Sequence, residues 1–320
     1  MRSRNVCVLG GTGFVGTHLC SSLARAGHRV TILTRDPERG RHLRVLPAVR
    51  LLHCDVHDER QLAAALAGHD VVVNLVGILN EAGQSGAGFR RAHAELARKV
   101  VAACGRNRID RLLHMSSLNA DASHGPSHYL RSKGEAERIV RDEGGPDFKW
   151  TIFQPSVIFG SGDSFINRFA GLLRSVPLVL PLARPDARLA PVWIEDVTAA
   201  MMKALDDDDT AGESYQLCGP QVFTLQQIVT CVRDELGLQR VIVRLPDFIA
   251  RLQAAAMDFV PGKPFSTDNY RSLTVDSVCS RNGFTRLGIQ PSGLQAIIPR
   301  YLGLEGGRSA YARFRSRARR

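Results

Sequence analysis

The chain has 320 residues, of which 44% are hydrophobic and 23% charged, a composition that is typical of a globular protein and excludes a disordered or fibrous one. Its 42 Lys and Arg exceed its 31 Asp and Glu, and this net charge of +11 raises the question of a nucleic acid or an anionic membrane as partner. The longest apolar runs are broken by Pro or Arg before about 18 residues, which argues against a bilayer-spanning helix.

The positive charge is concentrated at the end of the chain. Residues 308–320 hold six Arg and no acidic residue, which is more than half of the net charge. An unpatterned cluster of like charges repels itself and stays solvated, so one interpretation is a solvated terminus. The other is a tether to phospholipid headgroups or to an acidic partner. The remainder has few aromatic residues and no recognition motif for nucleic acid, so we expect no nucleic-acid partner.

Apolar, β-branched runs alternate with segments of helical period through the first half of the chain. The pattern predicts strands at residues 6–9, 29–34, 49–54, 71–76, 111–115 and 150–154, and helices near residues 14–26, 59–67, 89–104 and 129–142. Strands that alternate with helices in this way form a parallel sheet covered on both faces. We therefore predict an α/β fold with a doubly wound parallel sheet of the Rossmann type.

The pattern loosens after Gly160 into segments rich in Pro and Gly, which indicate short elements between turns. We predict a first domain over residues 1–160 that holds the sheet. A smaller C-terminal substrate-side domain is expected over residues 161–305, with some chain returning to the sheet, followed by a basic tail over residues 306–320. A helix near residues 197–205 precedes four consecutive acidic residues, Asp206 to Asp209, which we interpret as a solvated loop rather than a metal site.

The seven cysteines form no C-x-x-C pair and lie mostly in apolar runs, where a reduced cysteine behaves as a small hydrophobic residue. This favours a reducing compartment. The first residues run directly into a predicted strand, which leaves no room for a signal peptide. We expect a cytoplasmic protein, peripheral to the inner membrane if the basic tail binds there.

A glycine-rich turn joins the first predicted strand to the first helix. Gly10 permits a turn without a Cβ, Gly13 lets the backbone approach a pyrophosphate, and Gly16 allows close packing of helix on strand. The helix N-terminus would then offer free N–H groups to the anion. The spacing predicts a dinucleotide-binding domain, with a cofactor site lined by Gly10, Gly11, Thr12, Gly13, Phe14, Val15 and Gly16.

The end of the second strand indicates which dinucleotide binds. An acidic residue there usually reads a free ribose 2′-hydroxyl, whereas Arg accommodates a 2′-phosphate. Arg35 stands at this place, nineteen residues after Gly16, which favours NADP(H) over NAD(H). Asp36 follows directly, and a shift of one residue in register would reverse the preference. Arg39 and Arg41 are candidate second cations.

Tyr129 and Lys133 lie four residues apart, so on a helix they share one face. A neighbouring cation favours the phenolate and lowers the pKa of a tyrosine toward neutrality, where it can donate or accept a proton. The preceding strand ends in Ser116 and Ser117, whose hydroxyls could hold a substrate carbonyl. We interpret these four residues as candidate catalytic groups.

Together these features resemble the extended short-chain dehydrogenase/reductase superfamily. More narrowly, the chain resembles its atypical branch that contains the nucleotide-binding accessory subunit of respiratory complex I, of the alpha-subcomplex subunit 9 type. The segments that carry the likeness are residues 73–79 (VNLVGIL), 114–117 (HMSS), 129–133 (YLRSK), 155–160 (PSVIFG), 165–169 (FINRF) and 191–197 (PVWIEDV).

The resemblance implies a role for each matching residue. The loop glycines would hold the pyrophosphate, Arg35 the 2′-phosphate, and Asp55 and Val56 the adenine edge. Tyr129 would be the general acid/base, beside Lys133 on the nicotinamide ribose. Ser117 fits the extended-family alignment, and Ser116 fits the usual spacing to the tyrosine. Further cofactor contacts would come from Asn74, Leu75, Val76 and Gly77, with Pro155, Ser156, Val157 and Ile158 closing over the nicotinamide.

The chain departs from the superfamily after the serines. Members that act on nucleotide sugars usually carry a V-Y-G-type stretch there, whereas residues 118–122 read LNADA, which argues against epimerase or dehydratase chemistry. In the complex I branch the resemblance implies tightly held NADPH that serves structure rather than turnover. We therefore expect an NADPH-binding accessory or assembly protein of the respiratory chain. The alternative is an active NADP(H)-dependent oxidoreductase on a small carbonyl, quinone-related or isoprenoid substrate.

Overall fold

The computed structural model describes residues 3–145, 147–261 and 263–302, and the predicted basic tail over residues 306–320 lies outside them. The chain divides into two compact units. Unit 1 comprises Met1–Pro155, Glu195–Leu217 and Ser280–Ile289, and unit 2 comprises Ser156–Ile194, Cys218–Cys279 and Gln290–Arg320. The domain limits inferred from the sequence remain a proposal beside this division. None of the helices in the described ranges is long and apolar enough to cross a bilayer.

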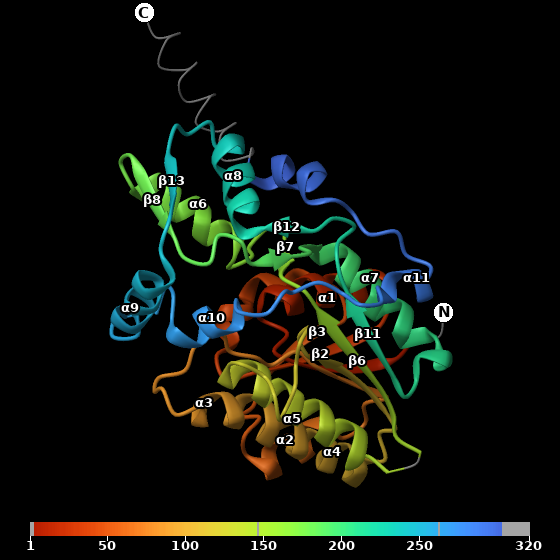
Figure 1. Ribbon diagram of the computed structural model, residues 1–320. Coiled ribbons are helices and arrows are strands. Elements are labelled where there is room, and N and C mark those ends of the chain that lie inside the picture. Colours follow the sequence, from red (N-terminus) through yellow and green to blue (C-terminus); the bar gives the residue numbers. More distant parts are fainter. Residues whose placement is uncertain (1–2, 146, 262, 303–320) are drawn as a thin grey trace, which may run out of the picture. The chain divides into compact units, whose positions relative to one another are not determined.

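Unit 1 is built on a seven-stranded parallel sheet with the strand order β11-β6-β5-β4-β1-β2-β3 (Figure 1). The strands are β1 (Asn5–Leu9), β2 (Arg29–Thr34), β3 (Val49–His53), β4 (Val71–Asn74), β5 (Arg111–Met115), β6 (Lys149–Pro155) and β11 (Glu213–Leu217). The chain leaves β1 toward β3 and then returns to build outward from β4. The doubly wound sheet predicted from the sequence is confirmed, with its switch point between β1 and β4.

Helices cover both faces of this sheet. In Figure 1, α2, α4 and α5 lie on one face, and α1 and α7 lie on the other, where His18 of α1 bonds Glu195 of α7 at 2.7 Å. The helices of unit 1 are α1 (Phe14–Arg25), η1 (Pro37–Val45), α2 (Glu59–Leu66), α3 (Ala87–Arg90), η2 (Arg91–Glu95), α4 (Leu96–Asn107), α5 (His128–Asp142), α7 (Ile194–Asp206), η3 (Asp208–Thr210) and α11 (Gly283–Arg286). Leu62, Leu96, Val100 and Ile139 pack on the sheet from the first face.

Two boundaries differ from the sequence prediction. The strand expected to reach residue 76 ends at Asn74, because the Asn74 side chain turns back to accept a hydrogen bond from Val76 N at 3.2 Å. The single helix expected near residues 89–104 is interrupted by η2, a short π-helix over Arg91–Glu95. Such insertions occur mostly at functional positions, and this one carries the buried His93.

Unit 2 consists of short strand pairs and helices. Its strands are β7 (Ile158–Phe159), β8 (Val179–Leu182), β9 (Arg188–Leu189), β10 (Val192–Trp193), β12 (Phe223–Thr224) and β13 (Val241–Arg244), paired as β7 with β10, β8 with β13 and β9 with β12. Its helices are α6 (Ile166–Ser175), α8 (Leu225–Glu235), α9 (Asp247–Met257), α10 (Thr267–Ser272) and the helical residues 294–302. Leu173, Ile228, Val232 and Ile298 form the centre of its main core.

The inference of a reducing compartment did not foresee that Cys218 and Cys279 form a disulfide. The two residues are 61 positions apart in the sequence, yet their Cα atoms lie 6.0 Å apart. Their segments are joined through Ala190, whose carbonyl accepts from Gly219 N, next to Cys218, and whose N–H donates to Ser277 O, two residues before Cys279. The pairing arises from this tertiary adjacency, which cysteine spacing does not reveal. Cysteine content therefore no longer argues for a reducing compartment.

Arg111 ties the start of β5 to its neighbours in unit 1. It is buried and donates to Lys149 O at 3.0 Å, to Ala204 O at 2.6 Å and to Thr210 Oγ at 2.9 Å. Burial lowers the pKa of its guanidinium to about 10. The side chain thus joins β5 to β6, to the end of α7 and to η3.

Replacing Arg111 by Met leaves three acceptors without their donor, so we expect a loss of about 2–4 kcal/mol in the free energy of unfolding. The matched control is Arg106→Met, because the exposed Arg106 makes only a 3.8 Å ion pair with Glu59, worth about 0–0.5 kcal/mol. Urea denaturation at neutral pH measures both. Equal losses in the two variants would contradict the structural role of Arg111.

Candidate dinucleotide-binding site

The glycine turn between β1 and α1 is packed too closely for side chains. Gly10 has a φ of +77°, and a Cβ at this position would lie 3.0 Å from the Leu75 carbonyl carbon. A Cβ at Gly16 would lie 2.4 Å from Gly10 O and 2.5 Å from the Cα of Gly11. Only glycine permits this approach of helix to strand, as the sequence spacing predicts. Gly11 and Gly16 are accordingly buried, and Gly13 is exposed.

The N-terminus of α1 has no side-chain cap. Its N-cap residue is Gly13, whereas Ser127 caps α5 and Thr224 caps α8 through side-chain hydrogen bonds to backbone N–H groups. The first turn of α1, which includes Phe14, Val15 and Gly16, therefore keeps backbone donors and the positive end of the helix dipole for a ligand. An anion such as a pyrophosphate fits this position.

A cavity of about 510 Å³ opens beside this turn in unit 1. Because the carboxyl ends of parallel strands meet at one edge of a sheet, residues that follow β1, β2, β3 and β4 all reach it. The lining residues are Gly10, Thr12, Gly13, Leu33, Thr34, Arg35, Asp36, Arg39, Cys54, Val56, His57, Leu75, Val76 and Gly77. Eight of the residues in the sequence-based cofactor set are among them.

Sequence reasoning missed several lining residues after β2 and β3. After β3, Asp55 and Val56 were predicted to contact the cofactor, but of these only Val56 lines the cavity. Their neighbours Cys54 and His57 also line it. The carboxylate of Asp55 accepts from His57 N at 3.0 Å, so it is used locally. The meeting of strand ends at one edge is the signal that could have identified the whole segment.

Arg35 and Asp36 both line the cavity, but only Asp36 has partners for its charged group among the described residues. The Asp36 side chain caps η1 by accepting from Glu38 N at 3.1 Å, and it lies 3.5 Å from the Arg39 guanidinium. Arg35 is exposed and forms no ion pair within the described ranges. The cation is thus available to an anion, while the neighbouring carboxylate is occupied.

Lys133 lies beside Gly77, one of the residues that line the cavity. Its Nζ donates to Met115 O at 3.0 Å and would lie 3.3 Å from a Cβ at Gly77. The side chain is buried, and burial lowers the pKa of its ammonium to about 8, against a smaller raising effect of Glu137. The Glu137 carboxylate accepts from Arg141 at 2.6 Å and from Gln154 at 2.8 Å.

Tyr129 packs against His93, a residue that sequence reasoning did not identify. The two rings meet edge to face with centroids 5.5 Å apart. Burial, and then Lys133, holds the pKa of His93 well below its usual range, so its ring is neutral. Ile78 N donates to His93 Nε2 at 3.2 Å, which leaves the proton on Nδ1 for Ser132 Oγ at 2.8 Å. Ser132 in turn donates to Tyr129 O at 2.9 Å, so His93 links the loop after β4 to the α5 turn that carries the tyrosine.

The two candidate serines differ in environment. Ser116 is buried, and its Oγ has no hydrogen-bond partner within the described residues. Ser117 is half-buried and donates to Leu118 O at 3.3 Å. His114, two residues before Ser116 on the same face of β5, accepts from Asn74 Nδ2 at 3.3 Å, and burial lowers its pKa to about 3. Ser116 therefore has the uncommitted hydroxyl of the pair.

The segment expected to close over the nicotinamide runs across the limit between the two units. Pro155 ends β6 in unit 1, where its carbonyl accepts from Leu118 N at 2.9 Å. Ser156 belongs to unit 2 and donates to Ser277 O at 2.8 Å, and Val157 and Ile158 follow into β7. Their contact with a cofactor remains a prediction.

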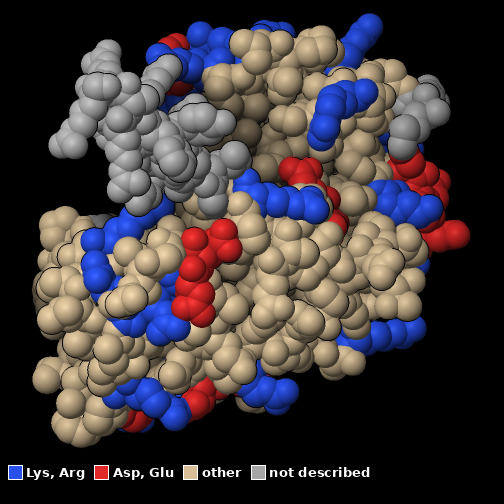
Figure 2. All heavy atoms as spheres, turned by 90° about the horizontal axis from the view of Figure 1, so that it is seen from above, with Lys and Arg blue, Asp and Glu red and all other residues tan. Residues whose placement is uncertain are grey.

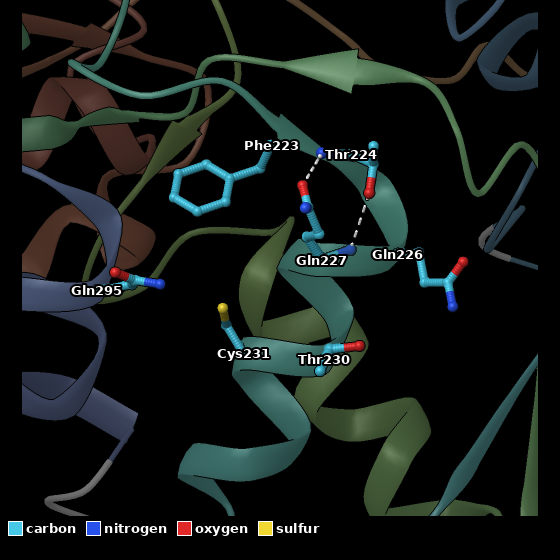
Figure 3. Close-up of a pocket in the computed structure, with 7 residues that line it drawn as sticks. All are labelled: Phe223, Thr224, Gln226, Gln227, Thr230, Cys231 and Gln295. Carbon is cyan, nitrogen blue, oxygen red and sulfur yellow. Dashed lines mark hydrogen bonds between the residues drawn. The ribbon is translucent and has the colours of Figure 1, made fainter.

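A second cavity, of about 450 Å³, lies within unit 2 at the start of α8 (Figure 3). Its lining residues are Phe223, Thr224, Gln226, Gln227, Thr230, Cys231 and Gln295. Thr224 and Gln227 are committed to each other, because each side chain bonds the other's backbone N–H in a capping box. None of these seven residues is charged, and Thr224 caps the N-terminus of α8, whereas the N-terminus of α1 has no side-chain cap. The first cavity is therefore the better candidate for a charged ligand.

Comparisons with known proteins show an NAD(P)H-binding domain in this part of the chain. The NAD(P)H-binding family model matches residues 10–163. Over 312 residues the chain is 31% identical to the mitochondrial NADH dehydrogenase (ubiquinone) 1 alpha subcomplex subunit 9 of Arabidopsis thaliana, covering 92% of this chain and 76% of that protein. It is 30% identical to the mitochondrial NADH-ubiquinone oxidoreductase 40 kDa subunit of Neurospora crassa, covering 92% and 78%.

A relative with a different name is a 4-hydroxy-2-methyl-3-oxo-4-farnesyl-3,4-dihydroquinoline-1-oxide ketoreductase of Stigmatella aurantiaca, 31% identical and covering 77% of this chain and 78% of that protein. Among solved structures, MoeE5 in complex with UDP-glucuronic acid and NAD matches with a TM-score of 0.73 at 18% identity, covering 93% of this chain and 98% of that one. Pal from Bacillus thuringiensis matches with a TM-score of 0.76 at 13% identity, covering 95% and 99%. These two likenesses show the fold alone.

The depressed pKa of Lys133 predicts a pH dependence of stability. Between pH 8 and 10.5, the ordinary lysine value, the unfolded chain holds a proton that the folded chain has released, so this residue's contribution to stability rises with pH across that window. The free energy of unfolding of the wild type relative to Lys133→Met should therefore increase from pH 8 to 10.5.

Urea denaturation at several pH values measures this difference. Lys203→Met is the control, because Lys203 is exposed and makes only a 3.8 Å ion pair with Asp207. A constant difference for Lys133→Met over the window would show that the ammonium is not held at a lowered pKa.

Proposed function

This chain belongs to the family of the NADH dehydrogenase (ubiquinone) 1 alpha subcomplex subunit 9, and on that premise we propose that it is an NADP(H)-binding accessory or assembly-type protein of a respiratory complex. The related proteins of Arabidopsis thaliana and Neurospora crassa are subunits of the NADH dehydrogenase by name. The observation that carries the cofactor part of the proposal is Arg35, which lines the cavity beside the uncapped N-terminus of α1 and forms no ion pair with another described residue.

The residues fit NADP(H) for a physical reason at each end of the cavity. The glycine turn leaves space and backbone donors for the pyrophosphate, since a side chain at Gly13 would approach Gly10 O to 3.3 Å. Arg35 would hold the 2′-phosphate, with Arg39 as a second cation. The Asp36 carboxylate caps η1, so it does not compete for a ribose hydroxyl. Lys133, beside Gly77, would bind the nicotinamide ribose.

In this role the dinucleotide serves structure. A cofactor that binds only the folded chain stabilises it in proportion to the logarithm of its concentration over its Kd, so tightly held NADP(H) makes a large contribution. We place the protein on the cytoplasmic side of the inner membrane, peripheral to it. The Arg-rich residues 308–320 would supply attraction to the anionic surface or to an acidic subunit.

An oxidoreductase on a small carbonyl, quinone-related or isoprenoid substrate is the second candidate. The neutral His93 and the buried Lys133 hold the α5 turn and the loop after β4 around Tyr129, and the relative from Stigmatella aurantiaca is a ketoreductase by name. A bound nicotinamide would supply the hydride. Tyr129 would donate the proton to the substrate oxygen, Ser116 would orient that oxygen, and Lys133 would lower the pKa of the phenol.

Arg35→Ala should weaken NADPH binding about 10- to 100-fold, because charge-assisted hydrogen bonds to the 2′-phosphate are lost, and should leave NADH binding unchanged. Arg44→Ala is the matched control, since Arg44 pairs with Glu38 at 3.1 Å and does not line the cavity. Isothermal titration calorimetry with both cofactors measures the effect. An equal loss for NADPH and NADH, or no loss, would refute the assignment of Arg35.

Tyr129→Phe separates the two functions. If the protein turns over, removal of the phenol should reduce single-turnover NADPH oxidation by about 10²- to 10⁴-fold across a panel of carbonyl and quinone substrates. If the protein has the accessory role, mass spectrometry and the absorbance spectrum should show that reduced dinucleotide co-purifies with both the wild type and Tyr129→Phe. It should not exchange in either of them. Turnover that depends on Tyr129 would reject the purely structural role.

A further inference from the structure

Helix α9 in unit 2 presents its large apolar side chains to solvent. Phe248 is 71% exposed, Leu252 is 70% exposed, and Phe259, in the turn after the helix, is 83% exposed. Ile249 and Val260 are also exposed, and these five residues form what we term the α9 apolar face. Leu252 follows Ile249 by three residues and Phe248 by four, the spacing that places side chains on one side of a helix, and Phe259 and Val260 come just after the helix ends at Met257.

The opposite side of α9 explains why the fold does not bury this face. Ala250 and Ala254 are fully buried and pack with Tyr270 of α10 in a small core of their own. The helix is thus attached to unit 2 through small residues, while its largest hydrophobic residues point away. Isolated exposed hydrophobic residues are ordinary, but five of them in one helix and the turn after it, two of them Phe, indicate an interaction surface.

The charges around the α9 apolar face favour a bilayer as its partner. The two carboxylates that border the face are held by other groups. Asp247 accepts from the Tyr270 hydroxyl and pairs with Arg251 at 2.8 Å, and Asp258 accepts from Thr267 Oγ at 2.6 Å. These two are the acidic residues of positions 247–260, and Arg251 is the basic residue of that segment.

The rest of the chain supplies the attraction to an anionic surface. The face of the molecule in Figure 2 carries Lys and Arg interspersed with Asp and Glu, without a continuous basic stripe. Six of the eleven surplus positive charges belong to the Arg residues of positions 308–320. A cationic segment joined to an aromatic, apolar helix face is the combination by which peripheral proteins bind anionic phospholipid.

We propose that the α9 apolar face docks on an anionic phospholipid bilayer, with Phe248, Leu252 and Phe259 inserted among the acyl chains. The inference deepens the peripheral placement in the proposed function and rests on it, but it does not depend on dinucleotide binding. In this proposal the α9 apolar face inserts into the bilayer. The Arg-rich residues 308–320 supply the attraction to the anionic headgroups.

Vesicle flotation with the full chain tests the proposal. Vesicles of phosphatidylcholine alone are compared with vesicles that also contain phosphatidylglycerol. The wild type should float with the anionic vesicles, and Phe248→Ser/Leu252→Ser/Phe259→Ser should reduce its partition coefficient at least about tenfold. Phe259→Ser alone should give a smaller loss in the same direction. Val45→Ser is the matched control, because Val45 is 82% exposed and lies in unit 1.

Three outcomes would overturn the proposal: no flotation of the wild type, equal flotation of the wild type and the triple variant, or a wild-type dimer that the triple variant dissociates without changing flotation. The last outcome would assign the face to a second copy of the chain. NADPH binding, measured on the same samples, should be unchanged in the triple variant, whereas Arg35→Ala should still float. The docking surface and the cofactor assignment can therefore fail separately.

Discussion

The contact of the α1 backbone with the glycine turn is the constraint on which the candidate site depends. Gly16 brings the first turn of α1 against Gly10 and Gly11 at a distance that excludes any side chain. Because Gly13 caps the helix without a side chain, the backbone donors at that end remain open to a ligand. The switch in strand order between β1 and β4 places the same turn beside the residues that follow β2, β3 and β4. One steric requirement thus gathers the lining of the cavity.

The interior beside Gly77 holds the buried cation Lys133 next to two neutral histidines. Lys133 is buried, and His93 and His114 both remain uncharged because burial and the lysine lower their pKa values. Glu137, the carboxylate that acts on Lys133, is shared with Arg141 and Gln154. A partly compensated ammonium acts strongly on whatever binds beside Gly77, since little water screens it. The same arrangement suits a tightly held ribose and a tyrosine with a lowered pKa, which is why the site supports two candidate functions.

The two units differ in how far their apolar side chains are buried. Unit 1 buries most of them against its sheet, as the alternation of strands and helices requires. In unit 2, α9 attaches through alanines and leaves two Phe and a Leu in solvent. Such exposure costs solubility unless a partner covers it, so the composition of α9 is explained by an interaction and not by folding. The sheet-based unit and the α9 apolar face therefore have separate roles, ligand binding and attachment.

Local pattern in the sequence was sufficient for the parallel sheet and the glycine turn, and it is the basis on which Arg35, Tyr129 and Lys133 are predicted as site residues. These depend on periodicity, on steric limits and on spacing within one helix, which act over a few residues. Tertiary structure decided the rest. It committed Asp36 to η1 while leaving Arg35 unpaired, brought His93 against Tyr129 through a π-helix, joined Cys218 to Cys279, and turned Phe248 outward from a helix that packs through Ala250. Each of these outcomes depends on which segments, distant in sequence, pack against a residue, and no local pattern contains that information.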